Sequence, residues 1–315
     1  MDNDLNRDTQ ARLKGHGRIG VVTVTYNSAS VLQPFMECVA KQTHVDFLLY
    51  IVDNASKDAT LQMVADFADP RFIPIPSAQN VGVAEGNNLG IRAALEAGCD
   101  SVLLLNNDTE FGPTMLKELA HGLEDHHVEM TCPKMMYFDE PHRIWAAGGT
   151  FQPLYGYRGV HYGEGEIDRG RYDEERIVTY VPTCCVLIAR SVFDKIGIMD
   201  ARYFVYVDDV DFMYRALMAG VKLFYLSKTV LLHKVSSLTG QEESTTMIRF
   251  CTRNRVYFLL KHLGWVRSSP YLFAYQAHYL LALVRGKMRR SVYSKKQTAV
   301  IEGMRMFHAA QSEKR

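Results

Sequence analysis

The chain has 315 residues, enough for one large α/β domain or two smaller ones. Its 36 Lys and Arg nearly balance its 35 Asp and Glu, so the overall charge does not indicate a nucleic-acid-binding protein. An apolar content of 47% supports a sizeable core and excludes a disordered chain.

The cysteines and the first residues indicate the compartment. The chain has 6 cysteines but no CxxC pair, a spacing that is poor for a metal site or a disulfide framework. We expect small buried thiols in a reducing compartment. Residues 1–17 are polar and charged, without the apolar stretch of a signal peptide, and predict a loose tail. These features favour a cytoplasmic protein.

Strands and helices alternate through the first part of the chain. Apolar or β-branched runs predict strands at residues 19–25, 47–52, 72–75 and 102–105. The third run carries two prolines, so we expect it to be short or at a sheet edge. Helices are predicted between the strands, over residues 31–41, through Phe67 and over residues 82–97. This alternation predicts an α/β fold with a mainly parallel sheet and right-handed crossovers.

Polar side chains follow each of these strands. They are Thr25, Tyr26 and Asn27, then Asp53 and Asn54, then Asn80, and finally Asn106, Asn107 and Asp108. Because open α/β sheets bind ligands beyond the carboxyl ends of their strands, this asymmetry favours a site. A carboxylate between short amides suits Mg²⁺ or Mn²⁺ bridging a diphosphate. Ordinary Asn/Asp turns explain the same residues without a ligand.

Three glycines are spaced four apart in the predicted helix after Asn80. Gly82, Gly86 and Gly90 share one face of that helix, beside Asn87. They form neither a GxGxxG motif nor a P-loop. Since each glycine costs a helix about 1 kcal/mol against alanine, the close approach of a strand or a ligand explains them as well as ordinary helix packing does.

The second half of the chain is less regular. A helix is predicted over residues 111–126, with Pro113 in its first turn. Residues 130–176, rich in Gly, Tyr and charge, predict a long surface excursion. Trp145 and the tyrosines of this segment either stack on sugar rings or cover a core. Residues 181–189 predict another strand, and a helix then ends at Gly197.

A strand-like aromatic run, residues 203–207, leads into Asp208, Asp209 and Asp211. A helix starting there would favour acidic residues through its dipole. Adjacent carboxylates also repel each other, which raises a pKa towards the range of a general base. The next strand-like run, residues 221–232, ends at His233, a residue type that serves as a structural group more often than as a metal ligand.

The C-terminal region combines apolar and basic residues. We expect a helix over residues 245–263, a break at Pro270 and an apolar helix over residues 271–284. This last run is too short to span a bilayer, which needs about 20 residues. Basic residues follow without an intervening acid: Arg285, Lys287, Arg289, Arg290, Lys295 and Lys296. The pattern suits peripheral contact with the cytoplasmic membrane as well as a helix packed on the core.

These motifs, taken together and in order, resemble the inverting family 2 glycosyltransferases of the GT-A fold, especially their rhamnosyltransferase-like branch. The matching residues span positions 20–235: Val24 to Ser28, Val52 to Ser56, Asn80 to Gly82, Gly86 to Gly90, Leu105 to Asp108, Asp208-Asp209 and His233. The resemblance implies a GT-A fold with a C-terminal helical extension. It also implies transfer of a sugar from a dTDP or UDP donor to a glycan or lipid-linked acceptor in cell-surface polysaccharide synthesis.

The resemblance also implies residue roles. Asn106 stands where the family has the first Asp of its metal motif, so the carboxylate contribution to a metal falls on Asp108, with His233 as a further ligand. Asp209 matches the catalytic base, and Asp208 and Trp145 belong to the acceptor side. The donor-binding set is Thr25, Tyr26, Asn27, Asp53, Asn80, Gly82, Gly86, Asn87, Asn106, Asn107 and Asp108.

The expected organisation is a tail over residues 1–17, a catalytic domain over residues 18–240 and a basic helical extension over residues 241–315. Residues 18–110 would form the nucleotide-sugar half of the catalytic domain and residues 111–240 its acceptor half. Alternative functions are a catalytically weak nucleotide-sugar-binding relative and a galactofuranosyl or hexosyl transferase. A nucleotidyltransferase is disfavoured because no glycine-rich basic loop follows the first strand. A processive synthase is disfavoured because no QxxRW-like motif is present.

Overall fold

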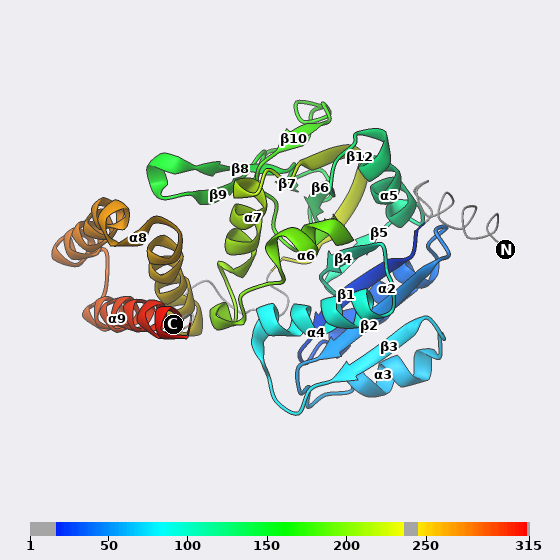
Figure 1. The fold of residues 1–315 in the computed structure, drawn as a ribbon, viewed down its shortest axis with the longest axis horizontal. Coiled ribbons are helices and arrows are strands. Elements are labelled where there is room, and N and C mark those ends of the chain that lie inside the picture. Colours follow the sequence, from blue (N-terminus) through cyan, green and yellow to red (C-terminus); the bar gives the residue numbers. More distant parts are fainter. Residues whose placement is uncertain (1–16, 236–244, 314–315) are drawn as a thin grey trace.

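The computed structural model describes residues 17–235 and 245–313. Its centre is a 10-stranded mixed sheet with the order β10-β12-β6-β11-β4-β1-β2-β3, to which β5 and β7 add through β12 and β6. Two C-terminal helices form the opposite end of the molecule from β2 and β3 (Figure 1). The expected tail, apart from residue 17, and the expected boundary at residues 240/241 lie outside the described residues.

The first half of the sheet follows the predicted alternation. Strands β1, β2 and β3 are parallel, and β4 pairs with β1 in the same direction. Their bounds are Ile19–Thr25, Phe47–Asp53, Phe72–Pro76 and Ser101–Leu105. The proline-containing β3 lies at the edge of the sheet, as predicted. The connecting helices are α2 (Ala29–Ala40), α3 (Thr60–Phe67) and α4 (Gly82–Glu96).

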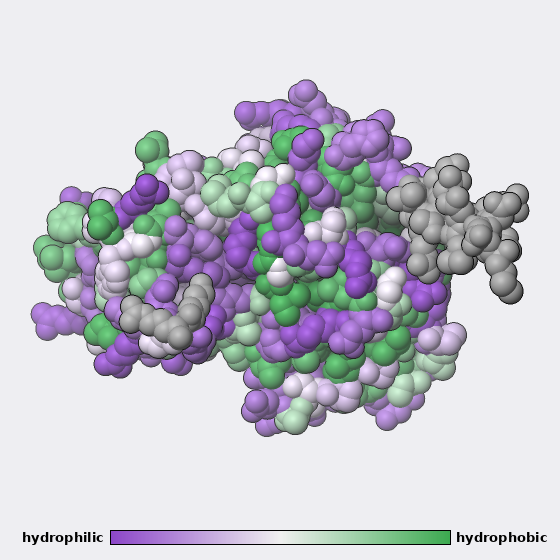
Figure 2. Space-filling view, viewed as in Figure 1, coloured by the Kyte–Doolittle hydropathy of each residue, from purple (hydrophilic) through white to green (hydrophobic). Residues whose placement is uncertain are grey.

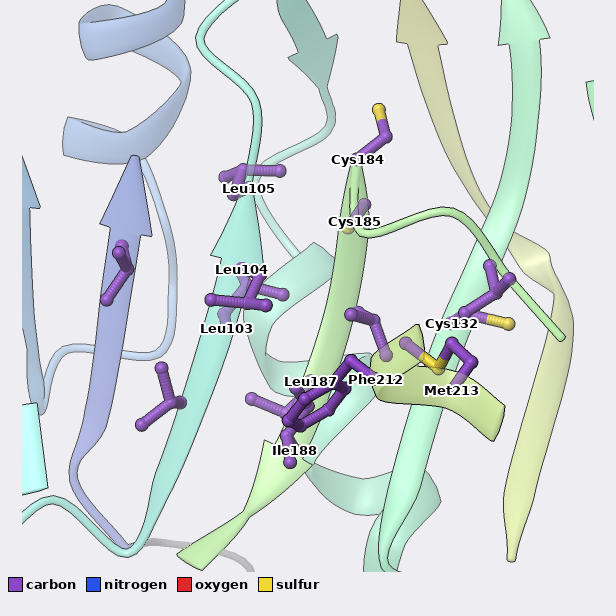
Figure 3. Packing of buried hydrophobic residues seen from close by; sticks show 14 of the residues in the cluster. Leu103, Leu104, Leu105, Cys132, Cys184, Cys185, Leu187, Ile188, Phe212 and Met213 are labelled. Atoms are coloured by element: carbon purple, nitrogen blue, oxygen red, sulfur yellow. The ribbon is translucent and has the colours of Figure 1, made fainter. Parts of the chain in front are cut away.

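The core forms where β4 meets the second half of the sheet. Every residue of β4 is buried. The strand pairs in the antiparallel direction with β11 (Cys185–Ala189), so that Leu103 stands opposite Leu187. Figure 3 shows Leu103 to Leu105 side by side with residues of β11, and Phe212 and Met213 packed nearby. All six cysteines lie in the described residues and are free thiols, four of them buried.

The glycines of α4 are explained by strand β1. A Cβ atom on Gly86 would lie 2.8 Å from Cγ1 of Val24, and one on Gly90 would overlap the side chain of Val22. The third glycine, Gly82, has a φ of +83° and faces Phe204. The close approach of a strand therefore accounts for two of the three glycines.

The second half of the sheet corrects two predictions. Phe111, the predicted start of a helix, ends strand β5 (Thr109–Phe111), and helix α5 (Met115–Asp125) starts after Pro113 instead of around it. The predicted surface excursion over residues 130–176 is wrong, because β6 (Met130–Tyr137) is a central strand with all but its last residue buried. The remaining strands of this segment are β7 (Ile144–Ala146), β8 (Gly149–Gln152), β9 (Arg158–His161) and β10 (Arg176–Val178).

A third correction concerns the residues before Asp208. Residues 203–207 are not a strand. A short 3-10 turn, η2 (Ala201–Tyr203), leads into a loop in which Phe204, Tyr206 and Val207 all have positive φ. The loop is followed by α7 (Asp208–Met218), and α6 (Arg190–Ile196) ends at Gly197 as predicted. The long strand β12 (Leu223–His233) then returns to the sheet.

The C-terminal region is a pair of helices. Helix α8 covers Thr245–Val284, but Gly264 has non-helical angles, so the chain bends there and not at Pro270. Helix α9 (Arg290–Ser312) packs against α8. No helix within the described residues is long and apolar enough to cross a membrane.

Replacing Gly90 with Ala tests the close packing of α4 on β1. The added methyl group would overlap the rigid, buried Val22 side chain, at an overpacking cost of about 1–3 kcal/mol that exceeds the gain of about 1 kcal/mol in helix propensity. Urea denaturation should show a net loss of stability. Gly112→Ala is the control, because a Cβ there meets no atom within 4 Å. Equal stability of the two variants would contradict the packing argument.

Candidate functional site

A cavity of about 440 Å³ opens at the carboxyl ends of the parallel strands. This volume is typical of small-molecule sites. The cavity is lined by Val24, Tyr26, Asn54, Asn80, Gly82, Val83, Asn87, Asn106, Asn107, Asp108, Phe204, Val205, Tyr206 and Thr246. Residues from four strand ends, the loop before α7 and the start of α8 therefore share one hollow.

Seven of the expected donor-binding residues belong to this lining: Tyr26, Asn80, Gly82, Asn87, Asn106, Asn107 and Asp108. Tyr26 is 47% exposed, so its ring is accessible from solvent. Asn80 accepts a hydrogen bond from the backbone nitrogen of Gly82 (2.9 Å), which fixes the turn into α4. Sequence reasoning gave no ligand role to Asn54, whose amide donates to the Gly82 carbonyl (3.0 Å) from within the same lining.

The other four expected donor residues, Thr25, Asn27, Asp53 and Gly86, are not part of this lining. The Thr25 hydroxyl donates to Oδ1 of Asp53 (3.0 Å), and both residues are buried. Asp53 also accepts hydrogen bonds from the backbone and hydroxyl of Ser56. Asn27 accepts one from the backbone nitrogen of Lys57 (2.8 Å). These bonds join the loops after β1 and β2 and shape the wall of the cavity.

Asp108 and His233 meet although they are far apart in sequence. Antiparallel pairing of β5 with β12 sets His233 opposite Thr109, the residue after Asp108. Nε2 of His233 lies 3.3 Å from Oδ1 of Asp108. Burial lowers the pKa of His233, but Cys184 and Asp108 more than offset this effect and raise the pKa to about 10. These neighbours therefore favour the protonated form of the ring, 3.3 Å from Asp108.

The chemistry of these side chains fits a divalent cation that also has ligands from a substrate. The described residues 17–235 and 245–313 contain no group of three His, Cys, Asp or Glu suited to a metal. The amide oxygen of Asn107, however, is buried without a hydrogen-bond partner, while its amide nitrogen donates to the Val24 carbonyl (2.6 Å). Mg²⁺ is commonly held by one or two carboxylates plus phosphate oxygens, so a partial protein ligand set is sufficient.

Asp209 at the start of α7 is engaged by a tyrosine. The hydroxyl of Tyr180 donates to Oδ2 of Asp209 over 2.6 Å. Burial raises the pKa of Asp209, and the Tyr180 hydrogen bond opposes this rise. Burial and the neighbouring Asp209 raise the pKa of Asp208 to about 8. Burial and Asp209 therefore favour the protonated form of Asp208, which relieves the repulsion between the two carboxyl groups.

Aromatic rings connect the two acidic groups. Trp145 lies between His233 (4.3 Å between ring centroids) and His161 (5.0 Å). His161 in turn stacks on Tyr180 at 5.8 Å, the residue that bonds Asp209. A continuous series of contacts thus leads from Asp108 to Asp209, and Trp145 stands at its middle. Sequence reasoning singled out Trp145 but gave no specific role to Tyr180 or His161.

The loop over residues 203–206 is held by α8. The buried amide of Asn254 lies within hydrogen-bond distance of the carbonyls of Tyr203 (2.9 Å), Val205 and Tyr206 (2.8 Å each). Arg253 also donates to the Tyr203 carbonyl (2.8 Å). The Phe204 carbonyl meanwhile accepts a hydrogen bond from the backbone nitrogen of Val83 (2.6 Å), in the first turn of α4. The loop therefore links the C-terminal helices to the cavity wall.

The sheet, the cavity at its carboxyl edge and the carboxylates beside it are the features expected of a GT-A type transferase. A family model described as glycosyl transferase family 2 matches residues 20–197. Because this match covers more than half of the chain, the protein belongs to glycosyl transferase family 2, and it is a glycosyltransferase.

Among relatives of nearly the same length are two bacterial transferases. The N-acetylglucosaminyl-diphospho-decaprenol L-rhamnosyltransferase of Mycobacterium tuberculosis is 24% identical over 90% of this chain and 97% of its own. The dTDP-rhamnosyl transferase RfbF of Shigella flexneri is 20% identical over 92% of this chain and 96% of its own. The rhamnosyltransferase-like branch expected from the sequence is therefore present among the relatives.

Solved structures support the fold. The mannosyltransferase PcManGT of Pyrobaculum calidifontis, determined with GDP-Man and Mn²⁺, matches 94% of this chain and 75% of its own, with a TM-score of 0.55 and 15% identity. Staphylococcus aureus TarS 1-349, determined with UDP, matches 94% of this chain and 92% of its own, with a TM-score of 0.53 and 16% identity. These similarities confirm the expected GT-A architecture.

Replacing Asn254 with Leu should destabilise the protein. The change keeps the side-chain volume but leaves the carbonyls of Val205 and Tyr206 without their side-chain donor, at a cost of about 1–3 kcal/mol. Urea denaturation measures the loss. Gln276→Met is the matched control, because that amide bonds only the Gln297 side chain in the half-buried contact between α8 and α9. An Asn254→Leu variant as stable as the control would mean that the carbonyls do not depend on this residue.

Proposed function

We propose that the protein transfers a sugar from a dTDP or UDP donor to a hydroxyl of a glycan or lipid-linked glycan, with inversion at the anomeric carbon. The observation that carries this proposal is the contact series in which Asp108 and His233 approach Trp145 from one side and Tyr180 and Asp209 from the other. Packed aromatic rings thus connect the proposed diphosphate site to the proposed base, and of the residues in this series only Asp108 lines the cavity. The full-length similarity to the two bacterial rhamnosyltransferases favours dTDP-rhamnose as the donor.

The donor would occupy the cavity beyond β1, β2 and β4. Tyr26 offers an accessible ring and Asn80, Asn87 and Asn106 offer amides, which suit a nucleoside with its many hydrogen-bonding atoms. In this proposal Thr25, Asn27, Asp53 and Gly86 act mainly by shaping the wall, because their side chains or close packing are already engaged by protein atoms.

Asp108, His233 and the amide oxygen of Asn107 are the residues that would hold Mg²⁺ or Mn²⁺. Such an ion supplies Lewis acidity to the diphosphate leaving group. His233 must lose its proton to act as a ligand, so we expect cation affinity to fall as the pH is lowered. Asn106, which replaces an acidic residue of the family motif, supplies only a neutral amide at this position.

Asp209 would accept the proton of the acceptor hydroxyl. An alcohol has a high pKa, and a positioned carboxylate removes its proton as the new glycosidic bond forms. A raised pKa makes Asp209 a stronger base than an exposed aspartate. One base with direct displacement inverts the anomeric centre. Trp145 provides an apolar ring surface for a sugar between the proposed metal ligands and the proposed base. Asp208, in its protonated form, can donate a hydrogen bond to the acceptor.

A donor screen combined with Asp209→Asn tests this function. Only a ligand that prefers the folded state raises the melting temperature, so dTDP-rhamnose and UDP-hexoses are compared by thermal shift with and without Mn²⁺. We expect one donor to raise the melting temperature by the same amount in the unmodified protein and in the Asp209→Asn variant. Transfer to a glycan acceptor should fall in the variant by roughly a factor of 100 or more. If no donor raises the melting temperature, the donor site is refuted. If the Asp209→Asn variant transfers sugar as fast as the unmodified protein, the role of Asp209 is refuted.

Tyr180→Phe tests how the proposed base is tuned. Removing the hydroxyl removes the hydrogen bond that lowers the pKa of Asp209, so this pKa rises further. Because the base acts in its ionised form, the acidic limb of the kcat/KM profile should move to higher pH. The aromatic ring that stacks on His161 is retained.

The control for this variant is Tyr172→Phe, which removes a hydroxyl bonded to Glu166 instead. Its pH profile should match that of the unmodified protein. An acidic limb that stays in place, or moves to lower pH, in Tyr180→Phe would contradict the assignment of Asp209 as the titrating base.

A further inference from the structure

Beyond the bend at Gly264, one face of α8 is apolar and uncovered. The exposed fractions are 86% for Val266, 76% for Phe273 and 74% for Val284, with Leu280 and Leu281 about half exposed. These residues recur at intervals of seven and four, which places them along one side of the helix. We call Val266, Phe273, Leu280, Leu281 and Val284 the apolar stripe.

The other side of the same helix is occupied by α9. Gln276 bonds Gln297 over 2.7 Å, and the ammonium group of Lys296 lies 4.7 Å from the centre of the Tyr279 ring. Tyr271 also reaches the β8–β9 hairpin, where its hydroxyl donates to the Pro153 carbonyl (2.9 Å). The orientation of the helix is therefore fixed by contacts on the far side, and these contacts leave the stripe facing outward.

Positive charge surrounds the stripe. Arg267 is exposed near its beginning, and exposed Arg285, Lys287, Arg289 and Arg290 follow its end. The sequence has no Asp or Glu between Thr245 and Ile301, so nothing in this stretch of chain neutralises these cations. Figure 2 shows hydrophobic and hydrophilic residues side by side at the end of the molecule formed by α8 and α9.

We propose that the apolar stripe and its basic residues form a docking surface for an anionic phospholipid bilayer. An amphipathic helix with aromatic and aliphatic residues on one face and Lys or Arg beside it lies in the headgroup region, with its apolar face in the acyl boundary. A second copy of the chain fits this surface less well, because pairing two such faces would bring like charges together.

This docking surface goes beyond the proposed function and does not depend on the donor. It assigns a binding partner to the C-terminal helices, for which the proposed function names none. Because α8 also holds the loop over residues 203–206 through Asn254, the same helix would contact both the bilayer and the wall of the cavity. A transferase with this arrangement would work on acceptors presented at the membrane surface.

Vesicle flotation of the full chain tests the proposal. The unmodified protein should float with vesicles of phosphatidylcholine and phosphatidylglycerol, remain unbound with phosphatidylcholine alone, and lose binding as salt is added. Phe273→Ser combined with Val284→Ser should lower the partition coefficient by roughly ten-fold or more, because it removes apolar area from the stripe. Replacing Arg285, Lys287, Arg289 and Arg290 with Gln should lower it by roughly five-fold per charge.

Val45→Ser is the matched control, since Val45 is 75% exposed and precedes β2, at the other end of the molecule from α8. It should bind vesicles like the unmodified protein. Melting temperature and donor thermal shift should be unchanged in all variants, which separates a failure of docking from a failure of the donor site. Equal binding to neutral vesicles, an equal loss in Val45→Ser, or no binding at all would overturn the proposal. A dimer in sedimentation that is lost with the stripe would assign the surface to a second copy instead.

Discussion

The arrangement of the site depends on one buried carboxylate, that of Asp211. Burial would raise its pKa, but His262, Lys261 and Arg215 overcome this effect and hold the pKa well below its usual range. The hydroxyl of Tyr203 also donates to it (2.9 Å). Through these partners the first turn of α7 is fastened to α8 and to the turn before the loop. Breaking a buried ion network leaves an uncompensated charge, so the network around Asp211 strongly constrains the positions of Asp208 and Asp209.

Much of the parallel half of the sheet could be predicted from local patterns, because a buried parallel strand is a continuous apolar run and prolines mark an edge. Strand β6 escaped prediction for a physical reason. It contains Lys134, a residue type that is rarely buried, and its charge is neutralised by Asp168 and Asp173 from a later loop (2.8 and 2.5 Å). Such compensation depends on tertiary contacts between residues more than thirty positions apart and leaves no periodic signal.

The contacts of the candidate site also include some that local sequence patterns predict and others that depend on the tertiary fold. The residues after β1, β2 and β4 could be predicted to meet because parallel strands bring their carboxyl ends to one edge. The hydrogen bond between Tyr180 and Asp209 could not be predicted from the sequence. It joins a single tyrosine beside a strand to the start of a helix, and no local pattern links the two. The loop before α7 resembled a strand by composition, since aromatic and β-branched residues favour strands. Its positive φ angles accompany hydrogen bonds from Asn254 and Arg253 to its carbonyls, contacts that no local pattern in the sequence reveals.

Those positive φ angles have a consequence for how such enzymes can be recombined. Non-glycine residues in this conformation are strained by about 1–3 kcal/mol each and persist only where their surroundings impose it. Here the groups that hold the loop are Asn254 and Arg253 of α8, beyond the residues that the family model matches, together with Val83 of α4. The helical pair is therefore not an interchangeable module: a chimera that borrows it from a relative must import the loop over residues 203–206 with it, or the cavity loses its wall.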